Sequence, residues 1–213
     1  MDLIDALKRF NRKERFHLLH HVLGYEGWSF RLSEEFRKDL CSNIGELVPP
    51  GALVMMDYHL DWISMAVWLS GRHELPTRQT PALNEARVVG NQEDIDLLVA
   101  FRSSGTVHIV LIEAKGDTSW SNSQLESKVL RLREMFGEVI PDGAKVRPHF
   151  VLMAPKESAA INAGTWPFWM KAAVDRQMCL PWPMTMKPTL CDAEGKAKRR
   201  GRFVRIDARR GCG

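Results

Sequence analysis

The fold is decided by Glu93-Asp94-Ile95-Asp96-Leu97-Leu98-Val99 and, after a turn, by Ile109-Val110-Leu111-Ile112-Glu113-Ala114-Lys115. Both runs are short and apolar, and the Arg102-Ser103-Ser104-Gly105 segment between them is typical of a turn. The pattern predicts two adjacent antiparallel strands. Because residues two apart on a strand share a face, we expect Glu113 and Lys115 to point the same way and Asp96 to converge on them.

Further elements are expected on both sides of this hairpin. The run from Glu85 to Val89, set off by Gly90-Asn91, predicts a preceding strand, so that residues 84 to 113 form a three-stranded antiparallel meander. A helix is predicted over residues 122 to 136 because apolar residues recur there at helical spacing. A further strand over residues 147 to 153 is expected to join the same sheet.

Upstream of the meander, residues 1–71 have the spacing of a helical N-terminal part. Ser33 with two acidic residues behind it predicts a helix start, and Gly45 predicts its end. We expect Asp57 to cap a later, very apolar helix that ends near Gly71.

The 213 residues suffice for one domain, which we expect to span the whole chain. Within it we distinguish the helical part (1–71), a core of strands and one helix (84–153), an irregular Trp- and Pro-rich part (154–195) and a basic tail (196–213). The fold class predicted is α/β, in the α+β sense of an antiparallel meander followed by a helix and a strand.

Charge is distributed unevenly along the chain. The last eighteen residues carry eight Lys or Arg and one Asp, a net charge of +7, whereas the other 195 residues sum to −3. Such a tail can attract nucleic acid through its phosphates, independently of sequence. The alternative is a solvated, disordered terminus.

The residues that carry chemistry are Asp96, Glu113 and Lys115. Two carboxylates supply the hard oxygen ligands that Mg²⁺ prefers, and Mg²⁺ binds through one or two of them together with substrate phosphate. A nearby ammonium can orient the attacking water or stabilise the charge that develops on a phosphate ester, so we expect Lys115 to assist the attacking water. This set predicts metal-dependent phosphodiester hydrolysis. The alternative is a cross-strand ion pair between Asp96 and Lys115 without a catalytic role.

On these residues the chain resembles the PD-(D/E)xK nuclease superfamily, whose restriction-endonuclease-like core is a helix, three strands, a helix and a strand. The resemblance places the motif Asp on Asp96 and the Glu-x-Lys on Glu113-Ala114-Lys115. Gln124-Leu125 matches the start of a Gln-Leu-x-x-Tyr motif found in one branch. It implies a Mg²⁺- or Mn²⁺-dependent endo- or exodeoxyribonuclease with DNA as partner, Asp96 and Glu113 as metal ligands, and Gln124 positioning the site or the substrate.

Some positions depart from the family pattern or leave a choice open. Lys128 stands where that motif has Tyr, so a basic group would replace the phenol at the phosphate, and Ile95 precedes Asp96 where the motif has Pro. The resemblance also implies an upstream acid, which is either Glu85 or the pair Glu34 and Glu35.

Two other functions remain open: a nucleic-acid-binding protein of this fold without cleavage, and a protein-interaction module that uses the Trp-rich C-terminal third. A homodimer or a protein partner is compatible with either. The N-terminus lacks a secretory pattern, the four cysteines have no CxxC spacing and no apolar run is long enough to cross a bilayer. We therefore expect a cytoplasmic protein without a membrane partner.

Overall fold

The computed structural model describes residues 1–10, 13–22, 30–70, 87–91, 93–116, 120, 122–181 and 185–209. Its helices are α1 (Leu3–Phe10), α2 (Glu14–Val22), α3 (Glu34–Ile44), α4 (Leu60–Leu69), α6 (Asn122–Phe136) and α7 (Phe168–Asp175). Its strands are β1 (Leu53–His59), β2 (Asp94–Ser103), β3 (Thr106–Ala114), β4 (Val146–Ala154), β5 (Met178–Cys179), β6 (Thr185–Cys191) and β7 (Phe203–Arg209).

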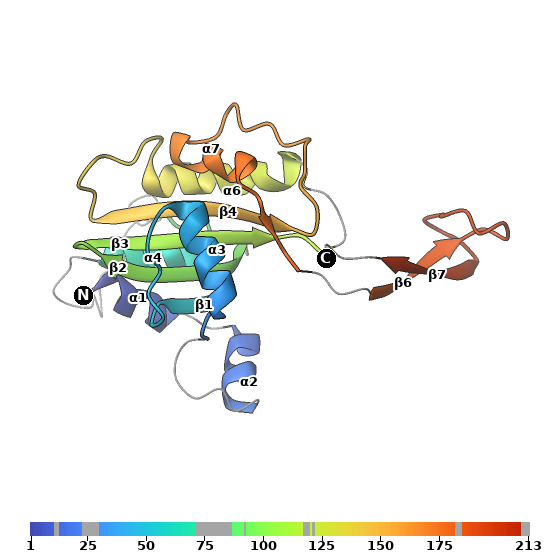
Figure 1. Cartoon of the computed structure of the whole chain (residues 1–213), viewed down its shortest axis with the longest axis horizontal. Coiled ribbons are helices and arrows are strands. Elements are labelled where there is room, and N and C mark those ends of the chain that lie inside the picture. Colours follow the sequence, from blue (N-terminus) through green and yellow to red (C-terminus); the bar gives the residue numbers. More distant parts are fainter. Residues whose placement is uncertain are drawn as a thin grey trace.

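Five of these strands form one mixed sheet in the order β1-β2-β3-β4-β5 (Figure 1). β2 pairs antiparallel with β1 and β3, whereas β3 pairs parallel with β4 and β4 with β5. Parallel neighbours need a long crossover, and α6 and α7 supply the two crossovers here. The predicted α/β class is therefore confirmed as a mixed sheet with helices.

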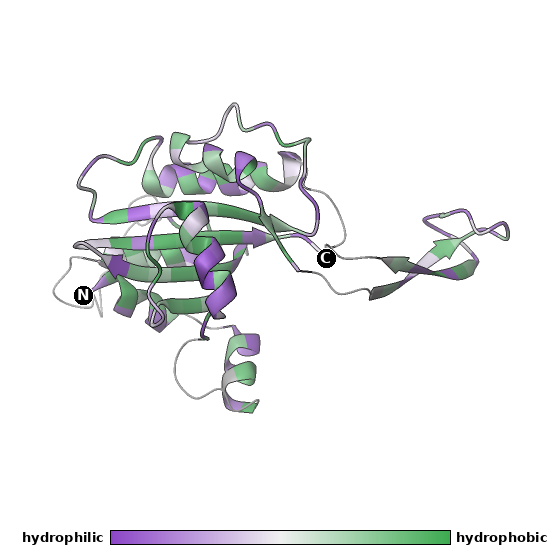
Figure 2. Cartoon of the chain, viewed as in Figure 1, coloured by the Kyte–Doolittle hydropathy of each residue, from purple (hydrophilic) through white to green (hydrophobic). Residues whose placement is uncertain are grey.

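Helices cover both faces of the sheet. Alternate strand residues such as Leu98, Leu111 and Leu152 pack with α1, α4, α6 and α7 in one apolar cluster. The residues between them, such as Val99 and Val110, pack with α3 in a second cluster. Figure 1 shows α3 in front of the sheet and α4 behind it. Figure 2 shows that the strands of this sheet are mostly apolar along their length, as expected for a sheet buried on both sides.

Several predicted elements are confirmed. β2, β3, α6 and β4 lie where the sequence predicts them, and all three of these strands belong to one sheet. Ser33 caps α3 by accepting a hydrogen bond from the Phe36 amide at 3.2 Å. Gly45 ends α3 in the left-handed conformation at φ 72°.

The predicted first strand of the meander is wrong. The strand beside β2 is β1, at residues 53–59, whereas residues 87–90 form no strand and Glu85 lies outside the described residues. The expected helix cap at Asp57 is wrong too, because Asp57 lies in β1 with φ 50° and α4 begins at Leu60. β1 starts with three buried apolar residues in succession, and such a run cannot be told from a buried helix by periodicity.

The C-terminal third is more regular than expected. The part expected to be irregular contains α7, β5 and β6, and the basic tail continues into β7 instead of remaining disordered to its end. Trp166 is buried edge-to-face against Phe150, with ring centroids 5.9 Å apart. β7, inside the basic tail, pairs with β6 in a separate two-stranded sheet. No described helix is long and apolar enough to cross a membrane.

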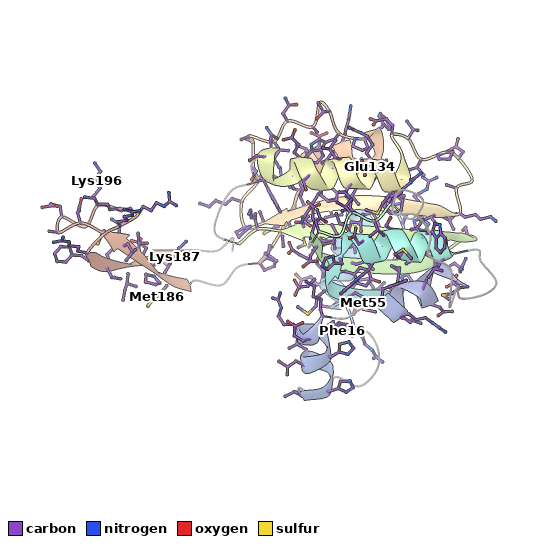
Figure 3. The ribbon with its side chains drawn as sticks, turned by 180° about the vertical axis from the view of Figure 1, so that it is seen from behind. Phe16, Met55, Glu134, Met186, Lys187 and Lys196 are labelled. Atoms are coloured by element: carbon purple, nitrogen blue, oxygen red, sulfur yellow. The ribbon has the colours of Figure 1, made fainter. Side chains whose placement is uncertain are left out.

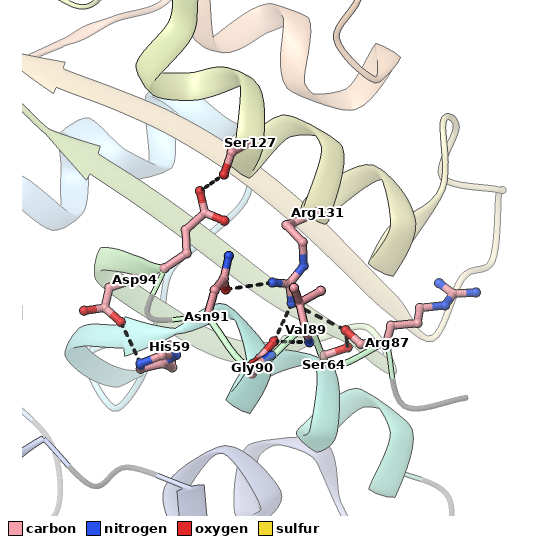
Figure 4. Close-up of polar contacts among 11 residues, drawn as sticks. His59, Ser64, Arg87, Val89, Gly90, Asn91, Asp94, Ser127 and Arg131 are labelled. Atoms are coloured by element: carbon pink, nitrogen blue, oxygen red, sulfur yellow. Dashed lines mark hydrogen bonds and ion pairs between the residues drawn. The ribbon is translucent and has the colours of Figure 1, made fainter. Parts of the chain in front are cut away.

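A buried ion pair ties the chain leading into β2 to the two helices beside it (Figure 4). Asp61 of α4 lies 2.5 Å from the Arg131 guanidinium of α6 and accepts hydrogen bonds from the Val89 and Gly90 amides at 3.1 and 2.8 Å. Burial alone would raise the pKa of Asp61, but the two amides and Arg131 together hold it below the usual value. The pair thus fixes α4 and α6 around residues 89–90.

We predict that Arg131→Met destabilises the protein by about 3 to 5 kcal/mol, because it leaves the Asp61 carboxylate buried without its cation. Urea unfolding should show this loss. The control is Lys38→Met, which breaks the exposed pair with Glu34 and should cost about 1 kcal/mol or less. Equal costs for the two variants would contradict a structural role for the buried pair.

Candidate functional site

Asp96 and Glu113 lie where β2 and β3 separate. The paired register ends at Leu97 opposite Ile112, and one further step along it sets Asp96 opposite Glu113. The Asp96 Oδ2 atom accepts a hydrogen bond from the Ala114 amide at 2.7 Å. The Asp96 side chain thus takes the place of the next backbone hydrogen bond between β2 and β3. This bond holds the Asp96 carboxylate beside the end of β3.

Glu113 is an acid inside the apolar layer. Its side chain follows Leu111 onto the face covered by α6, and the residue is only 4% exposed. Burial raises the pKa of Glu113 to about 7; the ammonium of Lys128 opposes this shift, while the charges of Asp96 and Glu93 add to it. Glu113 and its two acidic neighbours therefore form a negative cluster at the end of the central strands.

Lys128, on α6, forms the ion pair with Glu113. The Lys128 side chain is 15% exposed, so its charge is also largely removed from water. The family pattern led us to expect this position at a phosphate group. In the structure its ammonium pairs with Glu113.

The Lys115 ammonium contacts an aromatic ring instead of the two carboxylates. Its ammonium is 5.3 Å from the centroid of the Trp120 ring, a cation–π distance. The Lys115 amide donates to the Met153 carbonyl at 2.8 Å, just beyond the end of β3. Asp96 and Lys115, both in the described part, form no ion pair, so the alternative of a cross-strand pair is wrong.

Glu93 was missed as a site residue by the sequence analysis. One of its carboxylate oxygens accepts a hydrogen bond from the Ser127 hydroxyl, one residue before Lys128 (Figure 4). Its other oxygen is buried and has no hydrogen-bond partner among the described residues. The residue stands just before β2, outside the strand pattern, so only its position three residues ahead of Asp96 could have drawn attention to it.

The other predicted residues are placed as follows. Gln124 belongs to the first turn of α6, but its side chain lies outside the described part of the structure. Glu85 also lies outside it. Glu34 and Glu35 are in the first turn of α3, where Glu34 pairs with Lys38 at 2.9 Å. Besides Asp96, the acid whose charge helps to raise the pKa of Glu113 is Glu93.

Neighbouring carboxylates on the β1 side already have cations. The Lys13 ammonium lies 2.7 Å from Asp94, and the guanidinium of Arg15 lies 3.3 Å from Asp57. Asp96, by contrast, takes part in no ion pair within the described ranges. Negative charge that has no cation is therefore concentrated on Asp96 and Glu93.

The donor set at this end of the sheet suits a hard divalent cation. Carboxylate oxygens of Asp96 and Glu113, with the unpartnered oxygen of Glu93 nearby, are the ligand type that Mg²⁺ and Mn²⁺ accept. No group of three or more His, Cys, Asp or Glu side chains is spaced to hold a metal in the part of the chain that the structure covers. The geometry therefore offers a two-carboxylate site, to be completed by water or substrate.

Comparison with known proteins adds no relative: no protein-family model, no curated protein and no solved structure matches this chain significantly.

We predict a pH-dependent difference in stability between the wild type and Glu113→Gln in the absence of metal. Between pH 4.5 and about 7 the folded wild type retains a proton on Glu113 that the unfolded chain releases, so wild-type stability falls as the pH rises through this window. The variant lacks this term, and the difference should change by about 3 kcal/mol across the window.

Urea unfolding at a series of pH values measures this difference. The control is Glu134→Gln, an exposed residue of α6, whose curve should stay parallel to that of the wild type. A Glu113→Gln curve that also stays parallel would show that Glu113 ionises with an ordinary pKa.

Proposed function

We propose that this chain hydrolyses phosphodiester bonds of DNA with the help of a divalent metal ion. The observation that carries the proposal is the placement of Asp96 opposite the buried Glu113 at the ends of two central strands, with a lysine from the crossover helix on the same carboxylate. A buried acid beside a second, unpaired acid destabilises the fold, so its presence favours a functional role.

The order of elements supports the same proposal. α3 is followed by the antiparallel strands β1, β2 and β3, then by α6 and by β4. This is the helix, three-strand, helix, strand order of the restriction-endonuclease-like core, with α4 inserted between β1 and β2. Asp96 and Glu113 occupy the second and third strands, as the resemblance implies.

In the proposed reaction Asp96 and Glu113 hold Mg²⁺ or Mn²⁺, and Glu93 adds negative charge beside them. The ion would supply Lewis-acid polarisation of a phosphate ester. Asp96 is preset for this role because the Ala114 amide fixes one of its oxygens and leaves the other available. Burial of Glu113 excludes water from one side of the site.

We assign the cation at the substrate phosphate to Lys128 instead of Lys115. The Lys128 ammonium already contacts the carboxylate of Glu113, so it can donate a hydrogen bond to a phosphate oxygen that lies next to that carboxylate. Lys115 is engaged with the face of Trp120, and its proposed role is to anchor the segment that follows β3.

The second candidate is a DNA-binding protein of this architecture that does not cut. It is favoured by one observation: Lys128 pairs with Glu113 and so already compensates the charge of this carboxylate. The two candidates differ in whether a divalent ion competes with Lys128 for Glu113.

We predict that Asp96→Asn lowers Mg²⁺- or Mn²⁺-dependent cleavage of plasmid and linear DNA by at least about 100-fold. Thermal stability should stay unchanged, because the Asn carbonyl can still accept the Ala114 amide. Lys128→Gln should lower cleavage similarly, whereas Lys115→Gln should retain most of it.

The control is Asp142→Asn, an exposed residue in the turn before β4, which should cleave like the wild type. Metal-independent cleavage, or full activity of Asp96→Asn, would contradict the proposal. DNA binding by the wild type without cleavage under any divalent ion would establish the second candidate.

A further inference from the structure

β6 and β7 form a ribbon of two strands that extends away from the rest of the chain. Their register runs from Thr185 opposite Arg209 to Cys191 opposite Phe203. Figures 1 and 3 show the ribbon projecting clear of the main sheet in both views. It leaves at the end of the sheet toward which β3 and β4 run, the end that bears Glu113.

The turn of this ribbon is a fixed structure. The Lys198 amide donates to the Leu190 carbonyl at 2.8 Å, and the Gly201 amide to the Lys198 carbonyl at 3.0 Å. Gly201 lies so close to the preceding strand that a Cβ atom there would be 2.4 Å from the Cys191 carbonyl oxygen. Only glycine fits this position, because any side chain there would collide with the backbone of β6.

Positive charge is concentrated on this turn. Five exposed cations lie between positions 196 and 202: Lys196, Lys198, Arg199, Arg200 and Arg202. None of the five makes an ion pair with a residue that the structure describes. Lower on the ribbon, by contrast, Arg205 pairs with Asp207 at 2.9 Å. Among the ribbon side chains that the structure describes, the five of the turn are therefore the cations available for a polyanion.

One face of the ribbon is apolar and uncovered. It consists of Met186, Pro188, Leu190, Val204, Ile206 and Ala208, which alternate with polar residues along both strands. Its larger side chains are between 48% and 77% exposed. Two strands of seven residues present about 24 by 10 Å, or roughly 240 Å² on each copy. Two such faces together give roughly 500 Å², well below the ~1,200 Å² of a stable dimer.

We infer that the ribbon is a DNA-binding arm that grips double-stranded DNA, with the turn 195–202 on the phosphates and the strands in the major groove. This inference rests on the proposed function, because it identifies the form of DNA that the site would receive. A major groove about 12 Å wide admits a two-stranded ribbon, and apolar side chains there can contact thymine methyl groups. The fixed turn presents its cations without a large ordering cost.

The position of the arm relates it to the carboxylate site. The ribbon leaves the molecule at the site-bearing end of the sheet (Figure 1), so a duplex that contacts the ribbon along its length extends toward that end. The arm supplies affinity that is independent of sequence, and the carboxylates act separately. Binding by the arm should therefore not require a metal.

The test is the salt dependence of binding to a random-sequence duplex in EDTA, between about 50 and 200 mM salt. The arm variant combines Lys196→Gln, Lys198→Gln, Arg199→Gln and Arg200→Gln. The matched control removes the same total charge from exposed body residues: Lys8→Gln, Arg9→Gln, Lys38→Gln and Lys156→Gln.

The slope of log affinity against log salt should flatten by about 3.6 in the arm variant if all four cations contact phosphate, and by less than about 1 in the control. A variant with Lys196→Arg and Lys198→Arg keeps the charge and should keep the wild-type slope. The duplex should also bind more tightly than a single strand of the same length.

Equal slopes in the arm variant and the wild type, or equal flattening in arm and control variants, would overturn the inference. So would tighter binding of the single strand. A dimer in sedimentation that Ile206→Ser dissociates, with an unchanged salt slope, would make the ribbon an interface between copies. Because binding is measured without metal, a flattened slope in the arm variant together with no cleavage by the wild type in the separate assay with Mg²⁺ or Mn²⁺ would support the arm while contradicting the proposed hydrolysis.

Discussion

The parallel pairing of β3 with β4 constrains the rest of the molecule. Antiparallel strands can be joined by a short turn, as β2 and β3 are, but a parallel pair needs a crossover that lies over one face of the sheet. α6 is that crossover, and its apolar side chains close the core above β3. The same constraint brings Lys128 of α6 over the last buried residue of β3, Glu113.

The contact between Lys128 and Glu113 is poorly explained by stability alone. Removing two charges from water costs several kcal/mol, and the attraction between them often does no more than compensate. Apolar residues at both positions would fill this layer at least as well. A carboxylate with a displaceable cation is instead what a site for a divalent ion and a phosphate group needs, since both charges then find partners when the ligands bind.

The elements whose apolar residues recur with a clear period in the sequence were predicted correctly. β2, β3, α6 and β4 have clear apolar periodicity, and Asp96 and Glu113 follow from the ends of two such strands. β1 was missed because its buried run resembles a helix segment and because α4 separates it from β2 in the sequence. The sequence placed Lys115 beside the two carboxylates, but in the structure the lysine paired with Glu113 is Lys128, since the spacing of side chains along a strand does not say which cation the crossover helix will supply.

Two further features depend on long-range packing. Glu93 joins the site only because α6 places Ser127 beside it, which no pattern around Glu93 indicates. Residues 203–209 of the basic tail form one strand of a ribbon, and the pairing of this strand with β6 could not be read from the charge pattern of the tail. Charge counting identified the basic segment correctly, but pairing with β6 concentrates five of its cations on one fixed turn.

The most direct measurement is the anomalous signal of Mn²⁺ in crystals soaked with that ion, at the end of the sheet where Asp96 and Glu113 lie. A metal site predicts a peak about 2 Å from a carboxylate oxygen of each residue, with the Lys128 ammonium displaced from Glu113. A map with no peak between the two carboxylates, and with Lys128 still paired to Glu113 at saturating Mn²⁺, would contradict it.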